Sequence, residues 1–154
     1  MIAVLDASAV ARLFLRDEAD ASAVLGVFDA VDRLAASRLV EPEVRAALAA
    51  AARAGRLRPA QHRSAVRRLH RILASVDAVE LTPAVARSAG DLAERRRLRG
   101  ADAVHLASAL VLGRDDVVLA TFDVQLGHAA RAEGLRVAPV PPDGPALPRR
   151  RSRG

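Results

Sequence analysis

Four acidic side chains stand at places in the chain where a carboxylate can do chemistry. Asp6 directly follows a short apolar run, residues 1–5, which predicts a strand buried on both faces. Asp123 directly follows a second apolar run. Asp102 opens an apolar helix, and Glu43 falls in the first turns of an alanine-rich helix. Ligands of parallel α/β sheets collect beyond the carboxyl ends of the strands, so we expect these acids to meet at one edge of a sheet.

The position of Asp102 predicts that its side chain points toward protein rather than solvent. Helical spacing places it on the same face as Leu106, Ala109 and Leu110. A carboxylate pressed against a core needs a partner. The chain contains no lysine, which leaves arginine, backbone amides or a metal ion as that partner.

Converging carboxylates in a chain without cysteine suit a hard cation. The absence of cysteine excludes thiolate zinc sites, cysteine nucleophiles and thiol redox chemistry. Mg²⁺ or Mn²⁺, bound by oxygen ligands and water, is the expected ion. A structural interpretation stays open beside this one: Asp6, Asp102 and Asp123 cap helices, and Glu43 is an ordinary surface charge.

Length and composition predict one main domain and a tail. The chain has 154 residues, 51% of them hydrophobic, and residues 1–140 can bury a core without disulfides. Residues 141–154 hold four prolines and an arginine cluster, which predicts a disordered tail. The sequence shows no leader and no apolar stretch of membrane-spanning length, so we expect a soluble, cytoplasmic protein. The net charge of +6 weakly favours an acidic partner such as nucleic acid.

Helical and strand-like segments alternate along residues 1–140. Helices are predicted over residues 7–15, 20–30, 38–53, 59–75, 83–97, 102–112 and 123–133, and strands over residues 1–5, 33–36, 78–81, 117–120 and 135–140. The strand at 33–36 is expected at an edge. This alternation predicts parallel strands joined by right-handed crossovers, an α/β fold with a three-layer α/β/α sandwich and a mostly parallel central sheet.

Single residues mark several of the helix ends. Asp20 and Thr82 are expected as N-caps, and Pro59 suits a first helical turn. Gly55 fits the position that follows a helix, and Gly100 is expected to interrupt the chain before the Asp102 helix.

Four stretches, in order, resemble the signature blocks of PIN-domain nucleases. They are Leu5-Asp6-Ala7-Ser8-Ala9, Glu43-Val44-Arg45-Ala46-Ala47-Leu48, Ala101-Asp102-Ala103-Val104-His105-Leu106-Ala107 and Thr121-Phe122-Asp123. Within that family the chain is most similar to the VapC-type toxins of bacterial type II toxin-antitoxin modules, over residues 1–140. The Asp102 block is the most specific. The Glu43 block is the weakest, because Glu41 competes for the same role.

The resemblance implies a metal-dependent endoribonuclease. Asp6, Glu43, Asp102 and Asp123 would hold one or two Mg²⁺ or Mn²⁺ ions, and a metal-activated water would attack the phosphodiester bond of RNA. The implied partners are an RNA substrate, an antitoxin encoded by a neighbouring gene and a second copy of the chain. An arginine of the antitoxin would replace the metal charge. A catalytically weak PIN fold that binds RNA or protein is the alternative.

Residues beside the four acids have more than one interpretation. Ser8 and Thr121 could donate hydrogen bonds to metal-binding carboxylates, although a local cap or turn role is favoured. His105 lies three residues after Asp102, so it could reach the site as a ligand or an acid, but a packed, hydrogen-bonded core residue is favoured. The run Arg95-Arg96-Arg97 either binds flanking phosphates or forms a solvated helix end.

The first two predicted helices carry more apolar residues than one sheet face needs. These residues are Val10, Leu13, Phe14, Val24, Leu25 and Phe28. We therefore expect these two helices, with the helix at residues 59–75, to leave apolar surface exposed beside the site. A homodimer and a helical antitoxin segment would cover it.

Two other classes of α/β protein fit less well. A receiver domain also places aspartates at strand ends, but it needs a lysine that this chain lacks. A phosphatase built on an Asp-x-Asp motif would need an acid at Ser8.

Overall fold

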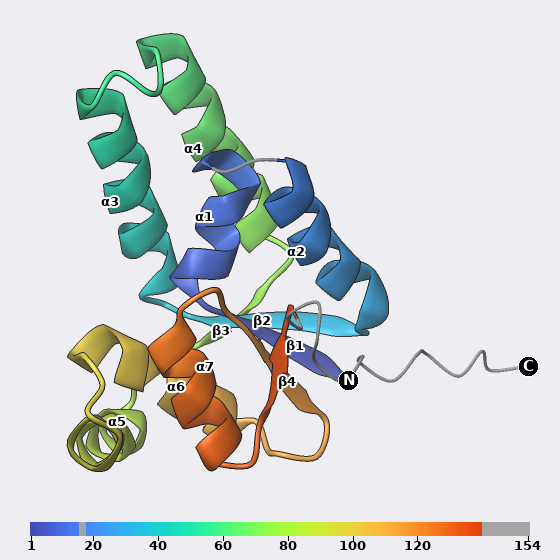
Figure 1. The fold of residues 1–154 in the computed structure, drawn as a ribbon, viewed down its shortest axis with the longest axis vertical. Helices are drawn as coiled ribbons and strands as arrows, with labels where there is room; N and C mark the ends of the chain where they lie inside the picture. The colour runs from blue at the N-terminus through green and yellow to red at the C-terminus, as the bar shows by residue number, and fades with distance from the viewer. Residues whose placement is uncertain (16–17, 140–154) are drawn as a thin grey trace, which may run out of the picture.

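A computed structural model describes residues 1–15 and 18–139 of the chain. Its centre is a parallel sheet of five strands in the order β3-β2-β1-β4-β5 (Figure 1). The strands are β1 (Ile2–Leu5), β2 (Arg33–Ser37), β3 (Asp77–Val79), β4 (Val117–Ala120) and β5 (Arg136–Ala138). The helices are α1 (Ala7–Leu15), α2 (Glu18–Ala30), α3 (Val40–Arg53), α4 (Pro59–Leu73), α5 (Pro83–Arg96), α6 (Gly100–Val111) and α7 (Val124–Ala132).

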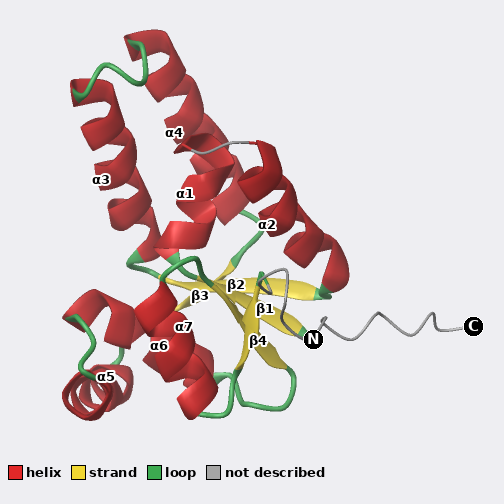
Figure 2. Ribbon diagram, in the orientation of Figure 1, coloured by secondary structure: helices red, strands yellow, loops and turns green. Residues whose placement is uncertain are grey.

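Helices cover both faces of this sheet. Figure 2 shows α1 to α4 on one face and α5 to α7 on the other. The central strands supply both layers of core because successive side chains of a strand point to opposite faces. Leu5 and Val118 pack in the core under α1 to α4, whereas Val4 and Leu119 pack in the core under α5 to α7. The predicted three-layer α/β/α sandwich with a parallel sheet is therefore confirmed.

One strand occupies a different position in the sheet from the one expected. β2 lies between β1 and β3 rather than at an edge, with Ala35 in register with Asp77. The three-residue β3 forms the edge instead. The reason is visible in the burial of β2: Ala35 and Ala36 lie in opposite core layers, so this strand is covered on both faces.

The helix ends largely follow the sequence signals. The Thr82 side chain accepts a hydrogen bond from the Val85 amide at the start of α5, and Gly55 follows α3 with a φ of +73°. Two expectations are wrong. Asp20 lies inside α2 and forms an ion pair with Arg12 of α1 rather than a cap. Gly100 is the first residue of α6 rather than an interruption before it.

The expected apolar surface on the first two helices is mostly absent. Val10, Leu13 and Val24 are buried, and Phe14 and Phe28 pack against the same core. They are covered because α1 contacts both α2 and α3, and α4 packs on α3. Of the six residues only Leu25 is largely exposed.

Two further expectations concern the ends and the surroundings of the domain. The tail expected at residues 141–154 lies outside the described residues. Across residues 1–15 and 18–139, no helix is both long enough and apolar enough to cross a lipid bilayer.

Candidate functional site

The four acids come from four separate elements that meet at the carboxyl edge of the sheet. Asp6 follows β1, and Asp123 lies three residues after β4, its neighbour in the sheet. Glu43 lies in the first turn of α3, and Asp102 in the first turn of α6. β1 and β4 are parallel and adjacent, so the residues that follow them leave the sheet at the same edge.

Asp6 is the most firmly held of the four. It is 4% exposed, and its Oδ2 atom accepts hydrogen bonds from Ser8 Oγ at 2.5 Å and from Thr121 Oγ1 at 2.9 Å. The Ser8 amide also donates to Oδ2, so the side chain helps to start α1. Its other oxygen, Oδ1, faces His105 Nε2 at 3.5 Å. Asp6 therefore caps α1 and also presents one oxygen to the site.

Ser8 and Thr121 tie the two strand ends together. Ser8 Oγ accepts from the Phe122 amide at 2.9 Å, and Thr121 Oγ1 accepts from the Asp123 amide at 3.0 Å. Each hydroxyl therefore has a local role and also donates to Asp6. These bonds fix the direction of the Asp6 carboxylate relative to Asp123. The donor role, which the sequence left as the less favoured alternative, is present.

Asp123 is the N-cap of α7. Its Oδ1 atom accepts a hydrogen bond from the Leu126 amide at 2.7 Å. The structural interpretation is therefore right for this residue, but the bond uses one carboxylate oxygen only. A capping carboxylate can still serve a site through its second oxygen.

Asp102 is not a cap, because Arg99 occupies the N-cap position of α6. The pKa of Asp102 is raised, first by burial and then by the negative charges of Asp123 and Asp6. Glu43 adds to this shift, while the positive charge of Arg99 opposes it. The other three carboxylates are thus close enough to Asp102 to disfavour its charged form.

His105 connects two of these acids. It is fully buried, as the sequence predicts, and its Nε2 atom lies 2.5 Å from Glu43 Oε2 and 3.5 Å from Asp6 Oδ1. Burial alone would lower the pKa of His105, but the bond to Glu43 and the nearby charges outweigh it and the pKa is raised. Nδ1 has no hydrogen-bond partner among the described residues. The spacing to Asp102, one helical turn, was the only sequence signal for this contact.

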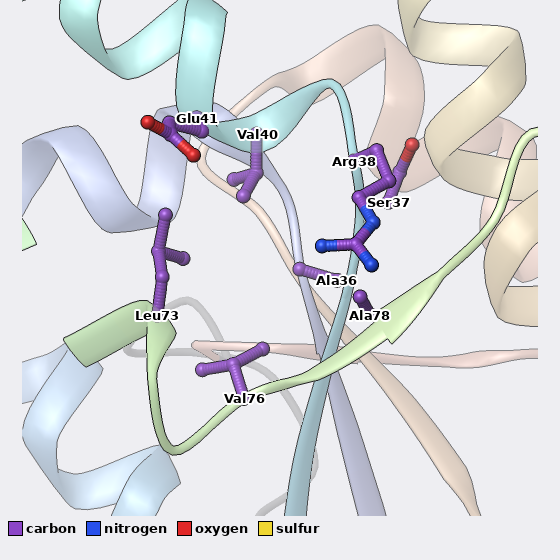
Figure 3. Close-up of a pocket in the computed structure, with 8 residues that line it drawn as sticks. All are labelled: Ala36, Ser37, Arg38, Val40, Glu41, Leu73, Val76 and Ala78. Carbon is purple, nitrogen blue, oxygen red and sulfur yellow. The ribbon is translucent and has the colours of Figure 1, made fainter. Parts of the chain in front are cut away.

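Glu41, the competitor of Glu43, faces a different part of the molecule. Its Oε1 atom lies 3.2 Å from His70 Nε2 and 3.6 Å from Arg45 Nη1. Figure 3 shows it lining a pocket together with Arg38 and Ser37. The volume of this pocket is about 80 Å³. Adjacent side chains of a helix point about 100° apart, so two positions along α3 separate an acid of the site from an acid of the surface.

The arginines ahead of Asp102 do not form a free helix end. Arg95 and Arg96 both bind Glu133, at 3.0 Å and 2.7 Å, and so fasten the end of α5 to the end of α7. These bonds lower the pKa of Glu133 to about 2, with the Arg95 hydrogen bond as the largest cause. The two guanidinium groups are nevertheless half and one third exposed.

The donor set at the sheet edge consists of carboxylate oxygens, the kind of ligand that hard divalent cations take. Four carboxylates meet there, and the pKa of Asp102 is raised first by burial and then by the charges of the other three, which the positive charge of Arg99 does not offset. Among the described residues no three His, Asp or Glu side chains stand ready in a metal-ligand arrangement. Part of the reason is that Glu43 is turned toward His105 and Asp123 toward the α7 amides.

Comparison with known proteins gives consistent results. The profile of the PIN domain family matches residues 3–132. The chain is 47% identical over 135 residues to the protein named Ribonuclease VapC45 from Mycobacterium tuberculosis, covering 88% of this chain and 93% of that one.

Solved structures with the same fold come from other prokaryotes. PAE2754 from Pyrobaculum aerophilum aligns with a TM-score of 0.65 and 27% identity, over 89% of this chain and 92% of its own. A chain of a toxin-antitoxin complex from Klebsiella pneumoniae aligns with a TM-score of 0.59 and 17% identity, over 81% of this chain and 89% of its own. At that identity the second alignment supports the fold alone.

Proposed function

The chain belongs to the PIN domain family, and on that premise we propose that it is a divalent-metal-dependent endoribonuclease, the toxin of a toxin-antitoxin pair. Its 47% identity to a protein named as a ribonuclease, over most of both chains, supports the activity. The observation that supports the metal dependence is the gathering of four carboxylates at the sheet edge, where burial first and then the charges of Asp123 and Asp6 raise the pKa of Asp102.

We assign the metal, Mg²⁺ or Mn²⁺, to Asp6, Glu43, Asp102 and Asp123. Carboxylate oxygens in a site without thiolates are the ligands that these ions prefer. A bound ion supplies the positive charge that activates a water molecule and stabilises the leaving oxygen of the phosphodiester. The carboxylate of Asp102 can meet its neighbours' repulsion in two ways, by taking up a proton or by facing a cation.

The chain's own residues orient these acids. Ser8 and Thr121 hold one oxygen of Asp6 and leave the other directed at the site, which supports Asp6 as a fixed ligand. The capping bond of Asp123 fixes that side chain at the start of α7, where we assign it to orienting the attacking water. His105 holds Glu43 in place and is a positioning residue in this account.

An antitoxin is the expected partner of such a toxin. The 47% identity to the protein named Ribonuclease VapC45 supports this assignment, because the VapC-type toxins that the sequence resembles belong to toxin-antitoxin modules. An arginine of the antitoxin could bind Asp6 and Asp102 in place of the cation, because its planar fork can bond two carboxylate oxygens at once. We also propose a homodimer, which sedimentation at micromolar concentration would test.

A cleavage assay tests the proposed function. The purified chain is incubated with single-stranded RNA in Mg²⁺, in Mn²⁺ or in EDTA, and cleavage is expected only with a metal. Asp115→Asn is the control for Asp→Asn variants of the four acids and should cleave like the wild type. Asp115 is exposed in the loop before β4, at the opposite edge of the sheet. RNA that binds without being cut by the metal-loaded protein would favour a binding module instead. Cleavage in EDTA would contradict the metal assignment.

A further inference from the structure

An arginine-rich groove lies between the end of α5 and one face of α7. Arg95, Arg96 and Arg97 line one wall, and Gln125 and His128 of α7 line the other. The groove is open to solvent and has a volume of about 300 Å³. Its lining residues include no Phe, Tyr or Trp, and the imidazole of His128 is the one ring among them, so the groove offers mainly charge and hydrogen-bond donors.

This groove begins beside the acid site. Gln125 is two residues beyond Asp123, and its Nε2 atom donates a hydrogen bond to the Arg97 carbonyl at 2.5 Å. Arg97 belongs to the short connection from α5 to α6, in which Arg99 is close enough to affect the pKa of Asp102. The nine residues of α7 extend about 13 Å from this point toward Glu133. The arginine wall therefore follows α7 away from its start, where Asp123 lies.

The positive charge of the groove is held in a fixed position. Glu133 is only 8% exposed and binds both Arg95 and Arg96, so one carboxylate balances two guanidinium groups. Arg96 also donates to the Ala132 carbonyl. Each guanidinium has five N–H donors, more than these bonds use. The ion pairs of Glu133 with Arg95 and Arg96 leave a net positive surface. Because these side chains are already held in place, they lose little conformational entropy when an anion binds.

The backbone of Arg97 gives a second, independent reason to look at this place. Its φ of 55° and ψ of 41° lie in the left-handed region, where a glycine is usual after a helix. An arginine here carries a conformational cost that glycine would avoid. In return the chain gains an exposed cation at the mouth of the groove, close to the acids.

We propose that this groove binds the phosphates of single-stranded RNA on one side of the scissile bond, with Arg97 as a positioning residue; the proposal rests on the proposed ribonuclease function. RNA is the occupant that the geometry favours because a strand that reaches the acids must continue past one side of them. Contacts to phosphates hold a strand in register without reading its sequence. The chain has three Phe and no Trp or Tyr, which also favours recognition through the backbone.

The test compares Arg97→Gly with Arg67→Ala. Glycine suits the left-handed backbone, so Arg97→Gly removes the cation without straining the fold. Arg67 is an exposed arginine on α4, which covers the opposite face of the sheet. Binding of a fluorescent 20-nucleotide RNA is measured by anisotropy in the Asp102→Asn background, across a series of salt concentrations, so that no cleavage disturbs the reading.

Arg97→Gly is expected to weaken RNA binding roughly fivefold and to reduce the slope of log K against log salt by about 0.7, the value for one phosphate on a single strand. Arg67→Ala is expected to leave both quantities unchanged. In the active protein with metal, Arg97→Gly should raise KM and leave kcat alone. The KM effect should vanish once the flanking nucleotides on one side of the cleavage point are removed.

Three results would overturn the proposal. One is unchanged binding in Arg97→Gly, and another is an equal loss in both variants, which would indicate non-specific attraction. The third is a polyglutamate peptide that binds in an Arg97-dependent way while RNA binding does not depend on Arg97, which would assign the groove to an acidic protein segment. Each can occur while the wild-type chain still cleaves RNA. Absence of any cleavage would instead contradict the proposed function.

Discussion

The two ends of α7 place acidic side chains in opposite electrostatic settings. At its start, Asp123 lies with Asp6, Glu43 and Asp102, and the pKa of Asp102 is raised. Just beyond its end, Glu133 is bound by two arginines, and its pKa is lowered to about 2. Both settings are partly shielded from solvent. The difference is whether the chain itself supplies the opposite charge.

This contrast separates acids that stabilise the fold from acids that serve a site. Glu133 gains on folding because its charge is compensated by the chain. Asp102 loses on folding, since burial and like charges disfavour its ionised form. A chain that keeps such a cost at the carboxyl edge of its sheet does so where a ligand can repay it.

The largest expected effect, on RNA cleavage, comes from neutralising an acid at the start of α7, the uncompensated end, where the chain does not supply the opposite charge. Asp6→Asn or Asp102→Asn should lower RNA cleavage with Mg²⁺ or Mn²⁺ by more than about 100-fold, because each removes a charged oxygen donor to the metal. Circular dichroism should show an intact fold for Asp102→Asn. Wild-type cleavage in either variant would show that the four acids are not the site.

Removing a bond that orients Asp6 should have the next largest effect. Thr121→Val deletes the hydroxyl that donates to Asp6 and accepts from the Asp123 amide. We expect kcat/KM for RNA cleavage to fall about 10- to 100-fold, as for other groups that hold metal ligands. Thr82→Val is the matched control: it removes the cap of α5 and should cost about 1 kcal/mol of unfolding free energy with no change in kcat. Equal kcat/KM losses in the two variants would remove the orienting role.

The compensated end should respond in stability rather than in activity. The full shift in the pKa of Glu133, from 4.5 to about 2, corresponds to about 3 kcal/mol. Because its arginine partners are half and one third exposed, we expect Glu133→Gln to lower the unfolding free energy by about 1 to 2 kcal/mol at pH 7. Denaturant unfolding measures this, with Glu94→Gln on the exposed face of α5 as control.

The lowered pKa of Glu133 also predicts how its contribution to the unfolding free energy changes with pH. Since the pKa of Glu133 is lower in the folded protein, the unfolded chain takes up this proton first as the pH falls. The stabilisation by Glu133 is therefore complete well above pH 4.5 and is lost as the pH falls toward 2. The difference in unfolding free energy between wild type and Glu133→Gln should shrink over that range, and a constant difference would contradict the ion-pair account.

The smallest expected effect is a gain in stability at the uncompensated end. The pKa of Asp102 is raised in the folded protein, so its charged form opposes folding above that pKa. In EDTA, Asp102→Asn should leave the unfolding free energy equal to that of wild type or raise it by up to about 1 kcal/mol at pH 7. The gain should disappear at acid pH, where wild-type Asp102 is protonated. A clear loss at pH 7 would mean that Asp102 serves the fold.

Local sequence patterns predicted most of the helices and strands. Apolar runs that end in an acid specified β1 and β4, and Thr82, Pro59 and Gly55 marked helix ends through cap and turn chemistry. The position of β2 could not be read in this way. A strand belongs at an edge or in the interior according to its neighbours. The strand predicted at residues 78–81 is present as β3, but its local pattern does not show that it pairs with β2.

In the candidate site, too, features set by local sequence pattern were predicted and features set by long-range packing were not. Strand ends and helix starts indicated Asp6, Glu43, Asp102 and Asp123, because each lies at a place set by local pattern. The contacts of His105 with Glu43 and of Arg95 with Glu133 join residues 62 and 38 positions apart. Such contacts depend on how helices pack across the sheet. The prediction of exposed apolar surface on α1 and α2 was wrong for the same reason, because α3 and α4 pack into the same core and cover these residues.

Direct titration with Mn²⁺ tests the central claim that the acids at the start of α7 form a cation site. Isothermal titration calorimetry at pH 7 compares the wild type with Asp102→Asn and with Glu133→Gln. The account predicts that the wild type and Glu133→Gln bind Mn²⁺ alike, whereas Asp102→Asn binds at least about tenfold more weakly. Equal binding by the wild type and Asp102→Asn, or no binding by the wild type, would contradict it.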